Sequence, residues 1–302
     1  MERARSAPPR TQRLRQLLEE ERPLILPGCF NAISAVMAER AGAKALYVSG
    51  AGVINGLTAY PDIGLLSMAE VVQQLRYVCN AVTVPVVADA DTGFGEGLLL
   101  WRTVEEYEHA GVAGMHLEDQ QMPKRCGHLD GKSLISLADM VIKVRTAVRA
   151  RSDPRFSIIA RTDARAVEGF DAAVERARAY VDAGADMIFP EALTTEEEFA
   201  RFAELVHGPL LANMTEFGKS PLLPADRLGQ LGYRAVIFPM TAFRVMLRAF
   251  ERCYAAVLQE GSQRQLLPEM TTRAELYEAI RYPEYEALDR ELGAEGTDRR
   301  TR

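Results

Sequence analysis

Four segments of the chain share one alternation of polar and apolar positions. In each, a helix-like pattern ends on a glycine and an apolar run begins three or four residues later, in segments 39–50, 108–119, 181–191 and 229–239. A glycine just past a helix supplies a left-handed cap. An apolar run of four to six residues between turn signals is typical of a strand buried on both faces. The pattern therefore predicts four units in which a helix leads into a buried strand.

Four more apolar runs complete the pattern, at 24–28, 85–91, 156–163 and 209–214. Helical patterns separate the eight expected strands, at 31–42, 68–81, 101–111, 137–151, 170–184, 195–206, 225–232 and 241–260. Strands that alternate with helices indicate a parallel sheet, and eight such units predict an α/β fold of the closed (β/α)8 barrel type. A doubly wound open sheet is the alternative, but no GxGxxG motif follows the first strand.

The two ends of the chain fall outside this pattern. We expect residues 1–22 to form a polar tail and a lead helix at about 10–20, and residues 23–261 to form the catalytic barrel. Residues 262–302 are expected to add C-terminal helices that end in a disordered segment at 293–302.

Composition restricts the class of protein. With 48% hydrophobic and 26% charged residues, a net charge of −6 and no basic stripe, the chain is typical of a globular enzyme and not of a nucleic-acid or membrane-surface binder. No apolar run is long enough to span a membrane, and the N-terminus lacks the apolar segment of a secretory signal. The four cysteines are far apart and form no CxxC pair, which favours reduced thiols in the cytoplasm.

Reactive side chains follow the predicted strands at their carboxyl ends, where barrels of this type place their active sites. The candidates are Ser49, Asp89, Asp91, His116, Glu118, Asp119, Arg161, Asp163, Glu191 and Asn213. Any one of them could cap the next helix or be solvated. Acids and an arginine at the ends of consecutive strands, however, would converge on one pocket.

Two of these acids favour a divalent cation. Asp89 and Asp91 alternate along the third predicted strand, so that both side chains would project to the same face. With Glu118 they form an oxygen-rich cluster that suits Mg²⁺, or Mn²⁺ as the alternative, better than Zn²⁺. Arg161 offers a bidentate grip for a substrate carboxylate. His116 lies in an apolar run and is as compatible with a supporting role as with a catalytic one.

The stretch KRCGH, residues 124–128, follows the fourth predicted strand and would hang over the same rim. Lys124, Arg125 and His128 are expected to favour the thiolate and to lower the pKa of Cys126 toward the working pH. A reactive thiol on a loop makes sense as a group that loop closure brings to the substrate. An incidental surface cysteine is the alternative. A metal role is disfavoured because one Cys and one His give too few ligands.

These motifs resemble the isocitrate lyase/phosphoenolpyruvate mutase superfamily, and most of all its methylisocitrate lyase family. The resemblance covers about residues 27–278 and is carried by HLEDQ followed by KRCGH, and by DADTGFG, ARTDA, FPEA and LANMTEFG. It implies a (β/α)8 barrel whose last helices are swapped between the subunits of a homotetramer. It also implies a Mg²⁺-dependent retro-aldol cleavage of a small tricarboxylate, 2-methylisocitrate, to pyruvate and succinate in propionate breakdown.

The resemblance further implies roles for individual residues. The expected catalytic residues are Cys126, Arg161, Glu118 and His128. The expected metal ligands, directly or through water, are Asp89, Asp91 and Glu118. The expected substrate-binding residues are Tyr47, Ser49, Gly50, Ala51, Asp62, Arg125, Gly127, His128, Arg161, Glu191, Asn213 and Arg244. Within this set Cys126 would be the general acid that protonates the carbanion left after the carbon–carbon bond breaks.

Several alternatives stay open at this stage. Sister activities on the same scaffold are 2,3-dimethylmalate lyase, isocitrate lyase, oxaloacetate decarboxylase and carboxyphosphonoenolpyruvate phosphonomutase. The family's serine-glycine turn often continues with a further glycine, whereas this chain has Ala51, whose methyl group would enter the pocket. Two other classes are disfavoured: a catalytically silent barrel would be expected to lack a metal acid or the cysteine, and neither is lost here. A Schiff-base aldolase would need a lysine at a strand end, and since no predicted strand ends in lysine this alternative is rejected.

Overall fold

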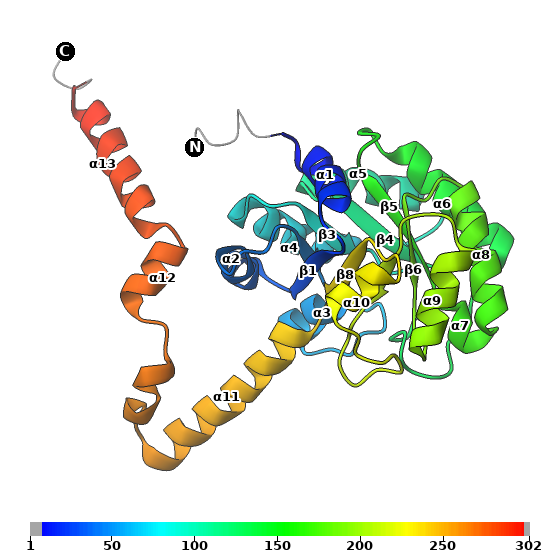
Figure 1. Ribbon diagram of the computed structural model, residues 1–302. Helices are drawn as coiled ribbons and strands as arrows, with labels where there is room; N and C mark the ends of the chain where they lie inside the picture. The colour runs from blue at the N-terminus through cyan, green and yellow to red at the C-terminus, as the bar shows by residue number, and fades with distance from the viewer. Residues whose placement is uncertain (1–7, 299–302) are drawn as a thin grey trace. The chain divides into compact units, whose positions relative to one another are not determined.

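Eight parallel strands form the centre of the barrel unit in the computed structural model, which describes residues 8–298 (Figure 1). The strands are β1 (Leu24–Cys29), β2 (Leu46–Val48), β3 (Val86–Asp89), β4 (Gly114–Glu118), β5 (Ser157–Thr162), β6 (Met187–Pro190), β7 (Leu211–Asn213) and β8 (Ala235–Phe238). Their order in the sheet is β6-β5-β4-β3-β2-β1-β8-β7. A parallel bridge between Ile188 and Leu210 joins β6 to β7 and closes the ring. The predicted α/β barrel of eight parallel strands is confirmed.

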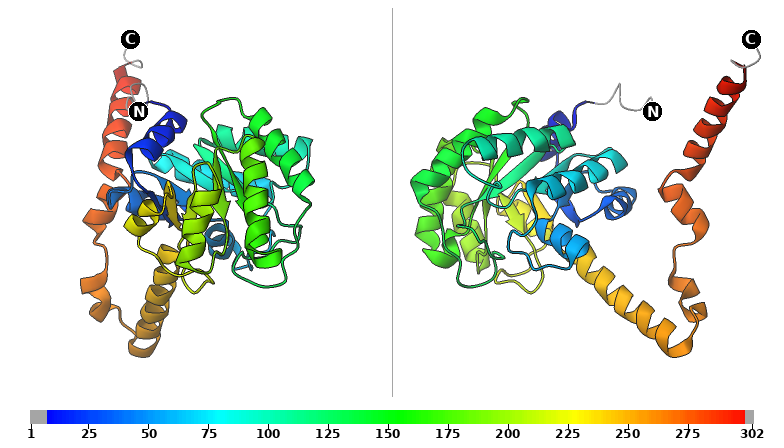
Figure 2. Two further views of the ribbon diagram at one scale, coloured as in Figure 1. Left: turned by 45° about the vertical axis from the view of Figure 1, so that its right-hand side comes forward. Right: turned by 180° about the vertical axis from the view of Figure 1, so that it is seen from behind.

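Helices lie around the outside of the strands, as the further views in Figure 2 show. They are α1 (Arg10–Glu20), α2 (Ala32–Arg40), α3 (Gly50–Thr58), α4 (Met68–Ala81), α5 (Leu98–Ala110), α6 (Leu137–Ala150), α7 (Ala164–Val167), α8 (Phe170–Asp182), α9 (Glu196–Leu205), α10 (Ala225–Gln230) and the start of α11 (Thr241–Glu260). Helices α3 and α7 were not expected from the sequence. Three glycines in α3 weaken its helix propensity, and α7 is a single turn.

The glycine that ends the helical pattern in each repeated unit has the expected left-handed backbone. Gly42, Gly111, Gly184 and Gly232 have φ angles of 97°, 91°, 102° and 100°. A residue with a Cβ atom is strained at such angles, which is why glycine recurs at this point of the unit. The local signal therefore sets where each helix stops and the next strand begins.

The strands separate two apolar cores. Side chains such as Ile158 point outward and pack against the helices, whereas the neighbouring Ile159 points into the barrel. The inner core also contains Leu14 and Leu17 of α1, which are buried among strand residues that include Leu24. The lead helix thus covers the amino-terminal end of the barrel, and the carboxyl ends of the strands are left for the pocket.

The chain divides into two compact units after Arg244, and α11 runs across this boundary. From Val245 onward the second unit contains the rest of α11, the short 3-10 helix η2 (Arg264–Glu269), α12 (Arg273–Ala279) and α13 (Tyr282–Asp298). The boundary expected from the sequence falls later, at the end of α11. No helix within residues 8–298 has the length and apolar character needed to cross a membrane.

One expectation for the C-terminal segment is wrong over part of its length. The segment 293–302 was expected to be disordered, but α13 continues to Asp298. Its alanine and glutamate residues are good helix formers, and two glycines do not outweigh them. Residues 299–302, like residues 1–7 of the expected N-terminal tail, lie outside the described part of the chain.

Candidate active site

A pocket of about 320 Å³ lies at the carboxyl ends of the strands, beneath the cysteine loop. The residues predicted from the sequence that line it are Tyr47, Ser49, Ala51, Asp62, Asp89, Arg125, Cys126, Gly127, His128, Arg161, Glu191, Asn213 and Arg244. The other candidates, Gly50, Asp91, His116, Glu118, Asp119 and Asp163, do not line the pocket. All but Asp119 touch a polar group of a lining residue, and Asp119 accepts the N–H of Asp163. The structure therefore brings together residues that come from almost the whole length of the barrel.

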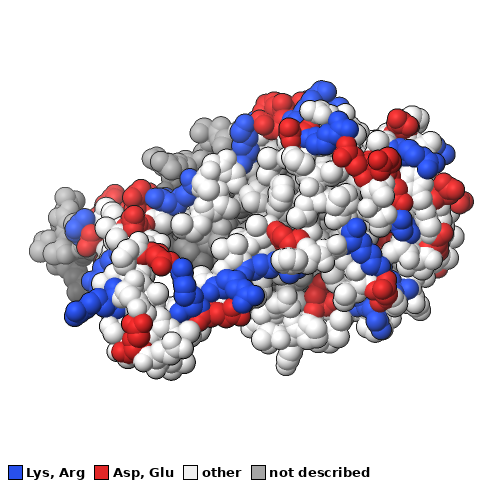
Figure 3. All heavy atoms as spheres, turned by 60° about the horizontal axis from the view of Figure 1, so that its bottom comes forward, with Lys and Arg blue, Asp and Glu red and all other residues white. Residues whose placement is uncertain are grey.

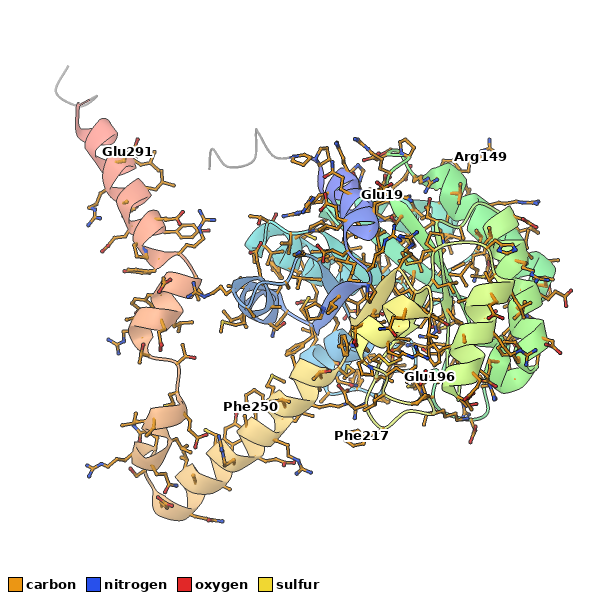
Figure 4. The ribbon with its side chains drawn as sticks, in the orientation of Figure 1. Glu19, Arg149, Glu196, Phe217, Phe250 and Glu291 are labelled. Atoms are coloured by element: carbon orange, nitrogen blue, oxygen red, sulfur yellow. The ribbon has the colours of Figure 1, made fainter. Side chains whose placement is uncertain are left out.

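The surface around this end of the barrel carries both signs of charge. Figure 3 shows lysine and arginine side chains beside aspartate and glutamate side chains on the face that it turns forward. Phe217, in the loop after β7, is 90% exposed and points away from the barrel (Figure 4). Its backbone has a φ of 61°, and its ring lies 5.3 Å from the guanidinium carbon of Arg244.

Asp89, at the end of β3, is fixed by three contacts. Its Oδ1 accepts the N–H of Asp91 at 2.9 Å and lies 3.2 Å from Nε2 of His116. Its Oδ2 accepts the N–H of Gly50 at 3.2 Å. Burial raises the pKa of Asp89, although the ammonium group of Lys124 opposes this effect. The carboxyl group is thus held in one orientation next to the pocket.

Asp91 reaches the site in a different way from the one predicted. The strand β3 ends at Asp89, and Asp91 lies in the following turn with a φ of 47°. The turn, and not the alternation of side chains along a strand, therefore determines where the Asp91 side chain lies. Its Oδ1 lies 2.8 Å from Nζ of Lys124, which also pairs with Asp62.

Lys124 is a buried cation among carboxylates. Burial alone would lower the pKa of Lys124, but Asp91, Glu118, Asp62 and Asp89 together hold it well above its ordinary value. The ammonium group therefore stays protonated. A protonated amine is no nucleophile, which agrees with the rejection of a Schiff-base mechanism.

The residues at this wall of the pocket fit a divalent cation. Within the described residues Glu118 Oε1 is buried with no hydrogen-bond partner. Burial raises the pKa of Glu118 well above its ordinary value, and it also raises the pKa of Asp91. Carboxylate oxygens that lack a sufficient counter-charge are the donors that Mg²⁺ takes. No group of three or more His, Cys, Asp or Glu side chains in residues 8–298 is arranged to hold an ion. Mg²⁺ keeps several of its waters, so carboxylates can hold it through water.

Arg161, at the end of β5, is the central cation of the opposite wall. Its Nε and Nη2 donate to Asp163 at 2.9 and 3.1 Å, and its Nη1 lies 3.2 Å from Oε2 of Glu191. Burial would raise the pKa values of Asp163 and Glu191, but Arg161 outweighs this effect and lowers both, with help from Lys132 at Asp163 and from His128 at Glu191. Both carboxylates are ionised and hold the guanidinium in place.

The cysteine loop is closed over these groups. Its base is joined by the antiparallel bridge between Gln120 and Leu134, and the Gln120 side chain binds the N–H and C=O of Arg125 at 2.9 and 2.8 Å. A Cβ atom added to Gly127 would lie only 2.4 Å from Arg161 Nη2 and from Glu191 Cγ. Glycine is therefore required at this position for the loop to lie so close to the cations and anions beneath it.

His128 is held in one tautomer by its neighbours. Its Nδ1 accepts the N–H of Lys219 at 2.9 Å, so the proton of the neutral ring is on Nε2. That nitrogen lies 3.0 Å from Oε1 of Glu191. The ring therefore links the loop after β7 to the carboxylate that also binds Arg161.

The expected depression of the Cys126 pKa is wrong. Burial raises the pKa of the Cys126 thiol, and the opposing effects of the His128 backbone and Arg161 do not overcome it. The neighbouring cations are engaged elsewhere, since Lys124 pairs with Asp62 and Asp91, and Arg125 donates to the carbonyl of Asp130 at 3.3 Å. The thiol consequently keeps its proton.

The start of α3 and the ring of Tyr47 also line the pocket, and the buried ring of His116 lies behind Tyr47. The Ser49 hydroxyl accepts the N–H of Gly52 at 3.2 Å and caps the helix, while the N–H of Ala51 in the first turn has no acceptor within the helix. Tyr47 Oη lies 2.7 Å from Nε2 of His116. Burial lowers the pKa of His116 to about 3, so this ring is neutral and supports Tyr47 and Asp89.

Sequence reasoning missed several residues at the site. Lys132 is buried and contacts both Gly127 and Asp163, yet nothing in its neighbourhood in the sequence marks it. Lys132 does not line the pocket itself; the lining residues that were not predicted are Asn55, Pro61, Ile63, Leu129, Phe189, Thr215, Ile237, Pro239 and Met240, and Lys124 was expected only to affect the thiol. Of these, Thr215 follows Asn213 in a motif already recognised, so that proximity in the sequence could have found it.

Comparison with known proteins identifies close relatives. The sequence profile of the phosphoenolpyruvate phosphomutase family matches residues 14–258. A 2-methylisocitrate lyase of Aeropyrum pernix is 52% identical over 279 residues, which are 92% of this chain and 90% of the relative. A 2-methylisocitrate lyase of Salmonella typhimurium is 46% identical over 276 residues, 91% and 94% of the two chains.

Solved structures agree with the fold. The crystal structure of 2,3-dimethylmalate lyase, a member of the PEP mutase/isocitrate lyase superfamily, has a TM-score of 0.89 and 34% identity over 95% of this chain and 96% of its own. Phosphonopyruvate hydrolase in complex with oxalate and Mg²⁺ has a TM-score of 0.84 and 29% identity over 93% and 98%.

The buried thiol leads to a prediction about reactivity. We expect the rate at which iodoacetamide alkylates Cys126 to rise at a higher pH in the folded protein than in the chain unfolded in urea, because burial disfavours the thiolate. The rate is measured across neutral and alkaline pH by mass spectrometry of the Cys126 peptide. A midpoint in the folded protein at or below that of the unfolded chain would contradict the raised pKa.

Proposed function

The chain belongs to the phosphoenolpyruvate phosphomutase family, and on this premise we propose that it is a cytoplasmic 2-methylisocitrate lyase, a carbon–carbon lyase that releases pyruvate and succinate. Relatives of that name align with more than nine-tenths of the chain. The observation in the structure that carries the proposal is the thiol of Cys126, held protonated by burial, which lines the same pocket as Arg161 and Asp89. Retro-aldol cleavage needs these three elements: a cation for carboxylates, a site for a metal and a proton donor for carbon.

The cationic wall would bind the carboxylates of the substrate. Arg161 lines the pocket with its guanidinium held by Asp163 and Glu191, and Arg244 lies at the start of α11 with Nε 3.4 Å from Glu216. Because Glu191 is itself ionised, it would position Arg161 and His128 instead of binding a carboxylate. Asn213 donates to Glu191 at 3.3 and 3.2 Å and holds this carboxylate from the β7 side.

The acid wall would hold the divalent cation. Asp89, Asp91 and Glu118 are the residues that we assign to Mg²⁺, directly or through water, with Mn²⁺ as the alternative. When bound, the ion would supply positive charge to the oxygens of the half that becomes pyruvate. A related protein of known structure, phosphonopyruvate hydrolase, binds Mg²⁺ together with oxalate, a dicarboxylate that resembles this half of the substrate.

The residues of the chain would then move one proton to carbon. A base takes the hydroxyl proton, the oxygen forms the carbonyl group of pyruvate, and the electron pair of the broken carbon–carbon bond remains on the succinate half. Cys126 donates its Sγ proton to that carbon and becomes a thiolate. The raised pKa suits this task, because a general acid must carry its proton at the moment of transfer. The closed loop excludes water, which would otherwise compete as a proton source.

A release assay tests the substrate. With Mg²⁺ present, we expect the purified protein to release pyruvate from 2-methylisocitrate at a kcat/KM at least about tenfold higher than that for pyruvate release from 2,3-dimethylmalate or for glyoxylate release from isocitrate. Activity should disappear with EDTA and return with Mg²⁺ or Mn²⁺. The 2,3-dimethylmalate comparison matters because the methyl group of Ala51 lines the pocket and affects which substituent fits. Preference for 2,3-dimethylmalate, isocitrate, oxaloacetate or a phosphonate would instead assign a sister activity.

A second experiment tests the proton donor. In Cys126→Ser we expect kcat to fall about 10²–10⁴-fold, because a hydroxyl group is a far weaker acid than a thiol in the same place. Ser is nearly isosteric with Cys, so the melting temperature should change little. Cys79→Ser serves as the matched control, since Cys79 is buried behind the barrel in the outer core. Near-normal turnover in Cys126→Ser would exclude the thiol as the acid.

We also propose that the enzyme is a homotetramer in which C-terminal helices are exchanged between subunits. In the second unit α11 exposes apolar side chains such as Leu258 and Tyr254 (Phe250 is labelled in Figure 4). In the barrel unit Ile25 is 48% exposed, in a groove formed by β1 and α2. Light scattering during size-exclusion chromatography should give four times the chain mass of 33.4 kDa. A monomeric mass would contradict the exchange.

A further inference from the structure

Lys132 lies on the returning limb of the cysteine loop, and its ammonium group is buried. Its side chain is 1% exposed. The Nζ atom donates to the carbonyl oxygen of Gly127, the residue that follows Cys126, and to Oδ1 of Asp163 at 2.8 Å. Lys132 does not line the pocket. It therefore connects the loop beside the thiol to the end of β5 without facing the substrate.

Asp163 is a rigid anchor for this contact. Its carboxylate binds the guanidinium of Arg161 through both oxygens, at 2.9 and 3.1 Å, and its N–H donates to Oδ1 of Asp119 at 2.9 Å. Asp119 in turn accepts the hydroxyl proton of Tyr180 at 2.8 Å. All three acidic and phenolic side chains are buried. The carboxylate that holds Lys132 thus has little freedom to move.

A buried ammonium group is costly unless its charge is paired and its protons are bound. A lysine that served only to fill space could be replaced by an apolar side chain of similar length, which would avoid this cost. Here the charge is directed at two specific acceptors, one on the loop and one on the barrel. This arrangement fixes the distance between the Gly127 peptide and the carboxylate that also orients Arg161.

We propose that Lys132 is a positioning residue that sets the Cys126 thiol relative to Arg161, by clamping the Gly127 carbonyl to Asp163. The neighbouring contacts of the loop do not replace this clamp. Gln120 holds Arg125 on the other side of the cysteine, and His128 binds Lys219 and Glu191 beyond it. Without Lys132 the Gly127 carbonyl would lose its charged donor, and the peptide next to the thiol could rotate. The consequence for turnover rests on the proposed role of Cys126 as proton donor.

The variant Lys132→Met tests this clamp, because methionine keeps the length and loses the charge. We expect kcat to fall about 10–100-fold while KM changes less than about threefold, since the pocket residues outside the cysteine loop keep their positions. We also expect iodoacetamide to alkylate Cys126 faster than in the wild type. The pH midpoint of alkylation should move down toward that of the unfolded chain, because burial raises the pKa of the thiol more than the His128 backbone and the charges of Glu191, Arg161 and Asp62 change it.

Lys143→Met is the matched control. The Lys143 side chain is also 1% exposed, and its Nζ also binds one carbonyl oxygen, that of Thr92 at 2.9 Å, and one carboxylate, that of Glu96 at 3.0 Å. The Lys143→Met variant therefore loses an equivalent ammonium group but leaves the contacts of the cysteine loop intact. We expect the alkylation rate and midpoint of Cys126 in this variant to equal those of the wild type. An equal increase in both variants would reduce Lys132 to a general structural role and overturn the proposal.

The two readouts separate this proposal from the proposed function. If the protein cleaves none of the substrates tested, the alkylation of Cys126 still reports whether Lys132 holds the loop. A folded Lys132→Met protein with wild-type alkylation and wild-type kcat would overturn the proposal. If Lys132→Met does not fold, Lys132→Gln is judged by the same measurements and limits, because its amide can still donate to Gly127 but cannot supply the charge to Asp163.

Discussion

The guanidinium group of Arg161 is the interaction on which this end of the barrel depends. It is buried and faces carboxylates from three consecutive strand ends, Glu118, Asp163 and Glu191. Two of these acids bind further side chains: Asp163 pairs with Lys132, and Glu191 binds His128 and Asn213. Breaking one partner out of a buried ion pair costs about 3–5 kcal/mol, because the remaining charge is left without compensation. The loop, the strand ends and the arginine therefore form one mutually dependent arrangement.

The acids of the pocket fall into two groups whose pKa values move in opposite directions. Burial raises the pKa values of Asp89, Asp91 and Glu118, whereas cations lower those of Asp163 and Glu191. At the first wall the charge of Lys124 does not offset the effect of burial, whereas at the second the charges around Arg161 do. A substrate that binds a divalent cation on one side and offers carboxylates on the other would satisfy both walls. This division would suit the proposed metal-assisted cleavage, and it comes from the placement of Lys124 and Arg161 more than from the number of acids.

Features with a local physical cause could be predicted from the sequence, and features with a distant cause could not. Four of the eight strands were located because each follows a glycine cap such as Gly111, and the other four because they are short apolar runs between helical patterns. The position of Glu118 or Arg161 followed from the rule that strand ends meet at one rim. The helix α3 was not predicted because its three glycines lower the helix propensity of the segment. Asp91 was predicted to lie in the strand, where its side chain would alternate with its neighbours, but it lies in the turn that follows. The contact between Lys132 and Asp163 joins residues that no local pattern connects.

The protonation state of Cys126 shows why the loop sequence alone was misleading. The neighbouring lysine and arginine suggest a thiolate when the segment is considered as an exposed loop. In the folded chain Lys124 is neutralised by carboxylates, and Gly127 allows the loop to lie against Arg161 and Glu191. The same close approach that requires glycine also removes water from the thiol, and loss of water stabilises the neutral form. A loop that opened would expose the thiol and favour its ionised form, so in the proposed mechanism closure would keep this cysteine an acid.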